Sequence, residues 1–316
     1  MPCYKPIDGY SSAYITANGK QRIVFSPAKS DNPKEIIPIP CGRCIGCRLE
    51  KAKEWALRCY HEALLYGENN VFLTLTYATE NLPKHNSLDK SDFQKFIRAL
   101  RKKTGAKIRY YMCGEYGEQC ANCHQNKKNC QDDPQCTEWV ATMGRPHYHA
   151  ILFNWKANDA ILVNIRNGNR VYTSKFLSGI WEKGTHELGS VTFKSAGYVA
   201  RYILKKQNGE RGRKYYGKRL APYTQMSLRP GIGKAWYEQN QKDFFPQDFA
   251  VLPDGRKTTV PTYYRNLLSK SDPALAEVLR TDRIAKSKIN PDNSDERLES
   301  REVVKQAQIN KLTRNL

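Results

Sequence analysis

Two histidines stand two positions apart in the stretch GRPHYHAILF, residues 144–153. Successive side chains of a β-strand point to opposite faces, so His147 and His149 would share one face while Tyr148 points to the other. Two imidazoles side by side can hold one divalent cation. Two hydrogen-bonded histidines on a half-exposed sheet would give the same pattern, so a third ligand is needed to favour a metal site.

Glu115, in the stretch CGEYG, is the candidate for this third ligand. We expect its strand to pair with the histidine strand around the residues that separate them. Two imidazoles and one carboxylate leave coordination positions open for water and for a phosphate oxygen, and they suit Mg²⁺ or Mn²⁺ better than a soft metal. Glu118 is the alternative if the register of the two strands differs.

Tyr198 and Tyr202 in YVARY have the i, i+4 spacing that places two side chains on one face of a helix. Tyrosines at this spacing usually pack in a core or at its boundary. Beside a metal site on a basic chain, a second interpretation gains weight: a tyrosine hydroxyl can attack a DNA phosphodiester and retain the strand as a phosphotyrosine ester. The neighbouring cations expected to bind the DNA backbone are Arg201, Lys205 and Lys206.

One group of cysteines lies within an expected insertion, residues 119–143, between the Glu115 and histidine strands. Four thiolates could form a tetrahedral zinc site that closes this polar loop, and His124 could replace one of them. The four candidate ligands are Cys120, Cys123, Cys130 and Cys136.

A second group, Cys41, Cys44 and Cys47, has three thiols within seven residues but no obvious fourth partner. Cys3 or Cys59 could complete a zinc site. Reduced cysteines packed at the start of a helix explain the group equally well, because free cysteines are commonly buried.

Apolar periodicity and turn residues indicate the elements that must position these side chains. The order predicts an α+β fold, a ferredoxin/RRM-like antiparallel sheet with helices on one face and an inserted cysteine-rich loop. A basic loop is expected at 207–220. The expected strands are 70–77, 107–118, 145–155 and 186–193, and the expected helices are 45–66, 89–104, 173–184 and 195–207.

Composition shifts divide the chain into four expected segments. The first is an irregular stretch with a basic helix, and the second is the core that carries the insertion. A C-terminal part of the domain follows, and then a charged tail that is helical or flexible. Their limits are 1–67, 68–210, 211–268 and 269–316.

The chain carries 52 Lys and Arg against 31 Asp and Glu among 316 residues, a formal net charge of +21. This excess predicts a polyanionic partner, nucleic acid first, and Arg48, Lys51 and Arg58 on the basic face of the helix expected over 45–66 are candidate contacts. No apolar run approaches the roughly 20 residues of a membrane span, and the first residues lack the apolar centre of a signal peptide. We therefore expect a cytoplasmic protein with reduced thiols.

Several motifs agree in order with one known family. FLTLTY, GRPHYHAILF and YVARYILKK resemble the three motifs of HUH endonucleases that start rolling-circle replication. With PCGRCIGCR, CGEYGE and RPGIGKAWYE they resemble the replication initiators of gokushovirus-type microviruses, which are single-stranded DNA phages. The likeness runs from about residue 1 to 265, and the insertion departs from it.

The resemblance implies a metal held by His147, His149 and Glu115, with Tyr198 and Tyr202 as nucleophiles. It also implies nicking of duplex phage DNA at the origin, a 5′-phosphotyrosine adduct, priming of the host polymerase and closure of the displaced strand into a circle. The sequence has no GxxxxGK[ST] phosphate loop, so a host helicase would have to unwind the DNA. The setting would be the host bacterial cytoplasm.

Two other hypotheses stay open. A non-catalytic, zinc-containing DNA-binding protein would explain the charge and the cysteines but would leave the paired tyrosines without a role. A histidine-triad phosphoesterase would need a third alternating histidine, and that position holds Ile151. The origin sequence and the oligomeric state do not follow from the sequence.

Overall fold

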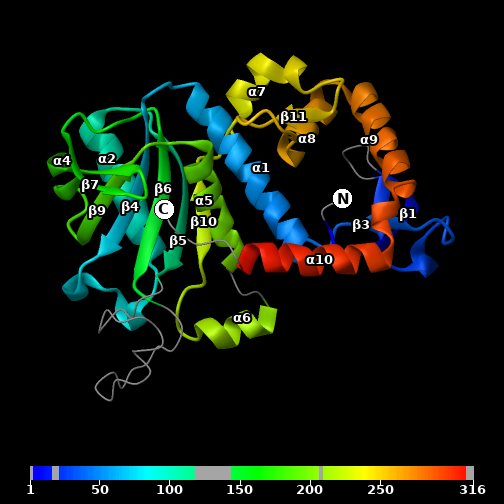
Figure 1. Cartoon of the computed structure of the whole chain (residues 1–316), viewed down its shortest axis with the longest axis horizontal. Coiled ribbons are helices and arrows are strands. Elements are labelled where there is room, and N and C mark those ends of the chain that lie inside the picture. Colours follow the sequence, from blue (N-terminus) through cyan, green and yellow to red (C-terminus); the bar gives the residue numbers. More distant parts are fainter. Residues whose placement is uncertain (1–2, 16–20, 118–143, 206–208, 311–316) are drawn as a thin grey trace. The chain divides into compact units, whose positions relative to one another are not determined.

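The computed structural model describes residues 3–15, 21–117, 144–205 and 209–310 (Figure 1). Backbone contacts divide the chain into two units, each described by itself below. One unit combines Met1–Lys51 with Asp272–Arg314, and the other contains Ala52–Ser271. The division falls inside helix α1 (Ile45–Leu64).

The larger unit is built on a seven-stranded sheet that is antiparallel throughout its described pairs, in the order β10-β5-β6-β4-β9-β8-β7. β4 and β5 both run antiparallel to β6, which lies between them, so they are parallel to each other and are joined by α2. The strands are β4 (Asn70–Tyr77), β5 (Arg109–Tyr116), β6 (Pro146–Phe153), β7 (Ala160–Arg166), β8 (Asn169–Ser174), β9 (Gly184–Gly189) and β10 (Tyr223–Met226).

One face of this sheet packs against α2 (Lys90–Thr104) and the short helix α4 (Lys175–Ser178). Every second residue of β4 is buried, and these residues meet the apolar stripe of α2. Asp89 caps the start of α2 by accepting a hydrogen bond from the Ser91 N–H, and Gly105 ends it in the left-handed conformation. The stripe consists of Phe93, Phe96, Ile97 and Leu100.

The opposite face is covered by α1 and α5 (Phe193–Lys205). Small residues, among them Ala56 on α1 and Ala196 on α5, let both helices pack against Tyr111, Ile151 and Phe153 of the sheet. The prediction of helices on one face only is therefore wrong. The physical reason is that α1, which precedes β4, and α5, which follows β9, each have an apolar stripe that must be buried.

The prediction is also wrong at two connections. The helix expected over 173–184 is reduced to α4. Residues 169–174 form β8, which pairs with β7 as a hairpin, and the helix already ends at Gly179. The basic loop expected over 207–220 contains α6 (Gly209–Tyr216). The expected cysteine-rich insertion lies outside the described residues.

The stretch RPGIGKAWYE, residues 229–238, packs against α1 within the larger unit. The Gly233 N–H donates to Glu62 Oε2 at 2.7 Å, and the Arg58 side chain donates to the Ile232 carbonyl at 3.1 Å. A Cβ at Gly233 would collide with the Tyr264 hydroxyl, and the φ of 78° at Gly233 also favours glycine. The elements here are α7 (Lys234–Asn240), α8 (Thr262–Ser271) and the pair β11 (Phe249–Val251) and β12 (Lys257–Thr259).

The smaller unit contains a three-stranded sheet in the order β2-β1-β3. Its strands are β1 (Ile7–Ile15), β2 (Gln21–Val24) and β3 (Ile37–Ile39), and its C-terminal helices are α9 (Pro273–Lys288) and α10 (Asp295–Asn310). The charged C-terminal segment is thus helical over most of its described length. None of the helices in the described part of the chain is long and apolar enough to cross a membrane.

Candidate metal centre

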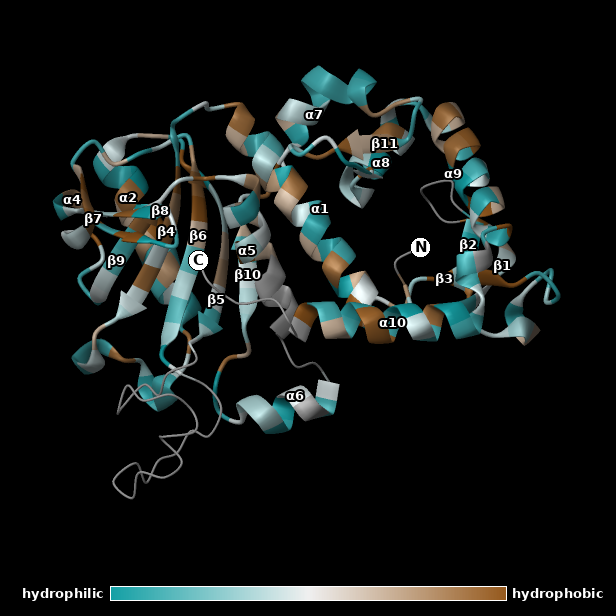
Figure 2. Cartoon of the chain, viewed as in Figure 1, coloured by the Kyte–Doolittle hydropathy of each residue, from teal (hydrophilic) through white to brown (hydrophobic). Residues whose placement is uncertain are grey.

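Three neighbouring strands of the large sheet, β5, β6 and β4, bring the predicted metal ligands to one place. Glu115 on β5 lies directly opposite His147 on β6, and Thr74 on β4 lies opposite His149. The alternation along β6 directs both histidines to the face that α1 and α5 cover. Figure 2 shows β6 hydrophilic in the half that carries the histidines and hydrophobic in the other half.

The two histidine side chains converge on one carboxylate oxygen of Glu115. His147 Nε2 lies 2.8 Å from Glu115 Oε1, and His149 Nε2 lies 3.1 Å from the same atom. The three potential ligand atoms are all within 4.8 Å of one another. Two imidazole nitrogens and a carboxylate oxygen form a donor set for a divalent cation, so these residues fit the metal that the sequence predicted.

The second nitrogen of each imidazole has a partner that turns Nε2 toward Glu115. His147 Nδ1 lies 3.0 Å from the Arg145 carbonyl oxygen, which can only accept, so Nδ1 carries the proton. His149 Nδ1 lies 2.9 Å from the Thr74 hydroxyl. For His149 Nε2 to be a ligand, Nδ1 must be protonated and donate to Thr74. Contacts of this kind set the tautomer of metal-binding histidines.

The Glu115 carboxyl is buried, which raises its pKa, but hydrogen bonds from His147 and His149 outweigh burial and lower the pKa to about 2. The carboxylate is thus ionised at neutral pH. A bound cation would take the place of the Nε2 protons that these two hydrogen bonds require, and it would meet an ionised carboxylate.

Tyr198 on α5 lies beside this site. Its half-buried ring packs edge-on against His149, with ring centroids 5.3 Å apart, and against Phe72 at 6.2 Å. The start of α5 is fixed by reciprocal hydrogen bonds: Thr192 N–H donates to the Ser195 hydroxyl at 2.8 Å, and Ser195 N–H donates to the Thr192 hydroxyl at 3.1 Å. The helix that carries Tyr198 is therefore held at its N-terminal end.

The other predicted site residues are placed only in part. The backbones of Arg201, Tyr202 and Lys205 belong to α5, but their side chains are not described. The remaining residues, Glu118, Cys120, Cys123, His124, Cys130, Cys136 and Lys206, lie outside the described residues.

The basic face of α1 has a mixed character. Arg48 is half-buried and Lys51 is exposed, both in the smaller unit. Arg58, on the same expected face, is enclosed: its guanidinium lies 4.0 Å from the ring centroids of both Trp55 and Tyr263. Arg58 therefore serves the packing of the larger unit.

Sequence reasoning missed the two groups that orient the histidines. Thr74 appears in the sequence as an ordinary β-branched strand residue, and its only signal is that it shares a strand face with Phe72 and Thr76. The Arg145 carbonyl has no sequence signal at all. Both become visible only when the register of β4, β6 and the residue before β6 is known.

Comparison with known proteins identifies a protein family and several relatives that this chain resembles. The family model for the replication-associated protein ORF2/G2P matches residues 70–125 and 134–207, which include β4, β5, β6 and α5. The replication-associated protein VP4 of Bdellovibrio phage phiMH2K is 34% identical over 284 residues, 86% of this chain and 79% of the relative. No solved structure matches the chain.

Two further relatives are also replication-associated proteins. The replication-associated protein ORF2 of Spiroplasma virus 4 is 29% identical over 84% of this chain and 79% of its own length. The replication-associated protein ORF4 of Chlamydia phage 1 is 30% identical over 54% of this chain and 38% of its own length. The chain therefore belongs to the replication-associated proteins of gokushovirus-type microviruses.

Proposed function

We propose that this protein is a replication initiator endonuclease that nicks phage duplex DNA at the origin and joins the ends again. The observation that carries the proposal is the convergence of His147, His149 and Glu115 on one point, with the Tyr198 ring against His149. The parallel pair β4 and β5 with β6 between them supports a ferredoxin-like HUH core.

His147, His149 and Glu115 would hold Mg²⁺ or Mn²⁺, which when bound polarises the scissile phosphate and offsets the charge that develops on it. The chain itself positions these ligands through Thr74 and the Arg145 carbonyl. Glu115 supplies the negative charge that two neutral imidazoles lack.

The tyrosine hydroxyl supplies the nucleophile. The hydroxyl gives up its proton as its oxygen forms a bond to phosphorus, the bond from phosphorus to the 3′ oxygen breaks, and the leaving oxygen takes up a proton, which yields a 3′-OH and a 5′-phosphotyrosine. The free 3′-OH primes the host polymerase, and a host helicase separates the strands. After one round the second tyrosine, Tyr202 if Tyr198 attacked first, cleaves the new origin, and the displaced 3′-OH attacks the first ester to close the circle.

The charge of +21 supports binding of single- and double-stranded origin DNA through the phosphate backbone. Arg201, Lys205 and Lys206 would bind the strand beside the nucleophiles, with Arg48 and Lys51 as further contacts. We place the reaction in the host bacterial cytoplasm.

The test is a covalent adduct between the protein and a single-stranded origin oligonucleotide on a denaturing gel. We expect an adduct with Mn²⁺ or Mg²⁺ and none with EDTA or with His147→Ala/His149→Ala. The matched control is His85→Asn, a change at an exposed histidine whose φ of 61° asparagine tolerates.

Wild-type adduct formation by the double alanine variant would refute the metal assignment. Binding of origin DNA without any adduct, under all metal conditions, would instead favour the alternative of a non-catalytic zinc-containing DNA-binding protein. A fully folded variant, checked by circular dichroism, is required in each case.

A further inference from the structure

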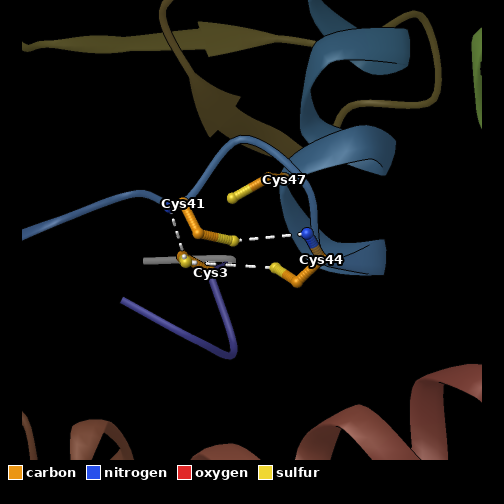
Figure 3. Close-up of side chains that lie close together, drawn as sticks. All are labelled: Cys3, Cys41, Cys44 and Cys47. Atoms are coloured by element: carbon orange, nitrogen blue, oxygen red, sulfur yellow. Dashed lines mark hydrogen bonds between the residues drawn. The ribbon is translucent and has the colours of Figure 1, made fainter. Parts of the chain in front are cut away.

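Four cysteines of the smaller unit point their sulfur atoms toward one another (Figure 3). We call Cys3, Cys41, Cys44 and Cys47 the cysteine cluster. The four Sγ atoms all lie within 4.8 Å of one another, and Cys3 Sγ and Cys44 Sγ are 3.9 Å apart. The fourth partner that the sequence left open is thus Cys3, since Cys59 lies in the larger unit and packs there against the sheet.

The backbone brings the cluster together from two distant segments. β1 and β3 pair antiparallel with Ile7 opposite Ile39, so the residues just before β1 meet those just after β3. Cys3 belongs to the first segment and Cys41 to the second. Gly42, with φ of 71°, turns the chain between Cys41 and the start of α1. Cys44 immediately precedes α1, and Cys47 lies in its first turn.

Backbone N–H groups surround the sulfur atoms. Tyr4 N–H donates to Cys44 Sγ at 3.3 Å, and Cys41 N–H donates to Cys3 Sγ at 3.3 Å. Arg43 and Cys44 N–H groups donate to Cys41 Sγ at 3.4 and 3.3 Å. N–H donors and the N-terminal end of α1 favour a negative charge on sulfur, so this environment suits thiolates.

The spacing of the sulfur atoms fits a metal better than a disulfide. A tetrahedral zinc with Zn–S bonds of about 2.3 Å separates its sulfurs by about 3.8 Å, close to the 3.9 Å between Cys3 and Cys44. A disulfide would need about 2.05 Å, and all four cysteines are free. Four protein sulfurs also leave no position for water, which is the arrangement of a structural and not of a catalytic site.

We propose that the cysteine cluster binds one zinc ion that fastens the N-terminal segment to the start of α1. Tyr4 of the N-terminal segment and Leu298 of α10 pack beside the cluster. Lys5 of the same segment forms an ion pair with Glu302 of α10 at 3.2 Å. The ion would therefore also stabilise the docking of α10 onto the N-terminal segment. This unit has only a small core, and a structural metal is a common supplement to one. The proposal does not depend on nicking activity.

The test uses the full-length chain with Cys120, Cys123, Cys130 and Cys136 replaced by serine, so that only the cluster can supply a set of thiolate ligands. Elemental analysis should find at least one zinc per chain, since the histidine–carboxylate site can hold a second ion. Cobalt(II) in place of zinc should give the intense absorption of a tetrahedral cobalt thiolate, which the histidine–carboxylate site cannot produce. Cys3→Ser and Cys44→Ser should each lose at least nine-tenths of the cobalt absorption and one zinc per chain, whereas the control Cys59→Ala should keep both.

The same single variants in the otherwise unchanged chain provide a second measurement, should the fourfold serine variant not fold. Each should contain one zinc fewer than the parent chain. Full zinc content in Cys3→Ser and Cys44→Ser would overturn the proposal, as would iron in place of zinc. Mass spectrometry that finds a disulfide within the cluster of the freshly purified protein would also overturn it.

Discussion

The hydroxyl of Thr74 provides a sensitive test of the metal centre, because it contacts His149 and not the metal position. Thr74→Val keeps the β-branched shape and the strand propensity of β4 but leaves His149 Nδ1 without its partner at 2.9 Å. His149 is buried, so water cannot easily replace the hydroxyl. The fold should survive, and the orientation of the imidazole should not.

The expected loss has a lower and an upper bound. One neutral hydrogen bond is worth about 1 kcal/mol, which corresponds to about a fivefold weaker Mn²⁺ affinity. Loss of a group that orients a metal-binding histidine typically costs ~10–100-fold, or about 1.4–2.7 kcal/mol. We therefore expect Mn²⁺ affinity to fall between about fivefold and 100-fold, as measured by calorimetric titration of the chelator-treated protein.

Thr76→Val is the matched control. Thr76 lies on the same strand and the same face, opposite His147 in the register, and its hydroxyl makes no hydrogen bond within the described part of the chain. This variant should bind Mn²⁺ within twofold of the wild type. Equal losses in both valine variants, or no loss in Thr74→Val, would show that the hydroxyl does not orient a metal ligand.

Three further predictions concern the nucleophiles, pH and salt. Tyr198→Phe and Tyr202→Phe should each keep part of the oligonucleotide cleavage and lose most circle production, whereas the double variant should form no adduct on a denaturing gel. Tyr172→Phe on β8 is the control, and loss of every adduct in Tyr202→Phe alone would exclude two alternating nucleophiles. Burial lowers the pKa of His61 to about 3, below the ordinary 6.5, so the neutral imidazole stabilises the fold fully above pH 6.5 and the free energy of unfolding falls by about 2 kcal/mol at pH 5. Denaturant unfolding at pH 7.5 and 5 should show a smaller decrease of this free energy in His61→Gln than in the wild type, and an equal decrease would contradict the prediction. Origin-duplex affinity should fall about a thousandfold between ~50 and ~200 mM salt if about six phosphates are contacted, and an affinity that does not change with salt would argue against a backbone-dominated interface.

The elements with strong local signals were predictable from the sequence. The partly alternating, β-branched stretch NVFLTLTY predicts β4 with its observed bounds, Asn70–Tyr77, and the cap residues Asp89 and Gly105 predict those of α2 to within one residue. The hairpin of β7 and β8, which is not among the predicted elements, also has a local sequence signal: Asn167–Gly168, both with positive φ, is the dipeptide that favours a two-residue hairpin turn.

The features that the sequence left open or placed wrongly depend on contacts between distant residues. The register of Glu115 against His147 cannot be derived from sequence when a long insertion replaces the turn that would set it. Arg58 appeared to belong to an exposed basic face, but Tyr263, far along the chain, stacks on it. Cys3 is likewise brought beside Cys41 by the pairing of β1 with β3.

The identity of the tyrosine that carries DNA tests the central claim most directly. Trypsin cleaves after Lys194, Arg201 and Lys205 and thus separates the two candidates into the peptides SAGYVAR and YILK. Mass spectrometry of the adduct formed with Mn²⁺ and an origin oligonucleotide should find the nucleotide on Tyr198, on Tyr202, or on each in separate molecules. A nucleotide found only on another residue, or no covalent nucleotide under conditions in which the DNA is cut, would contradict the account.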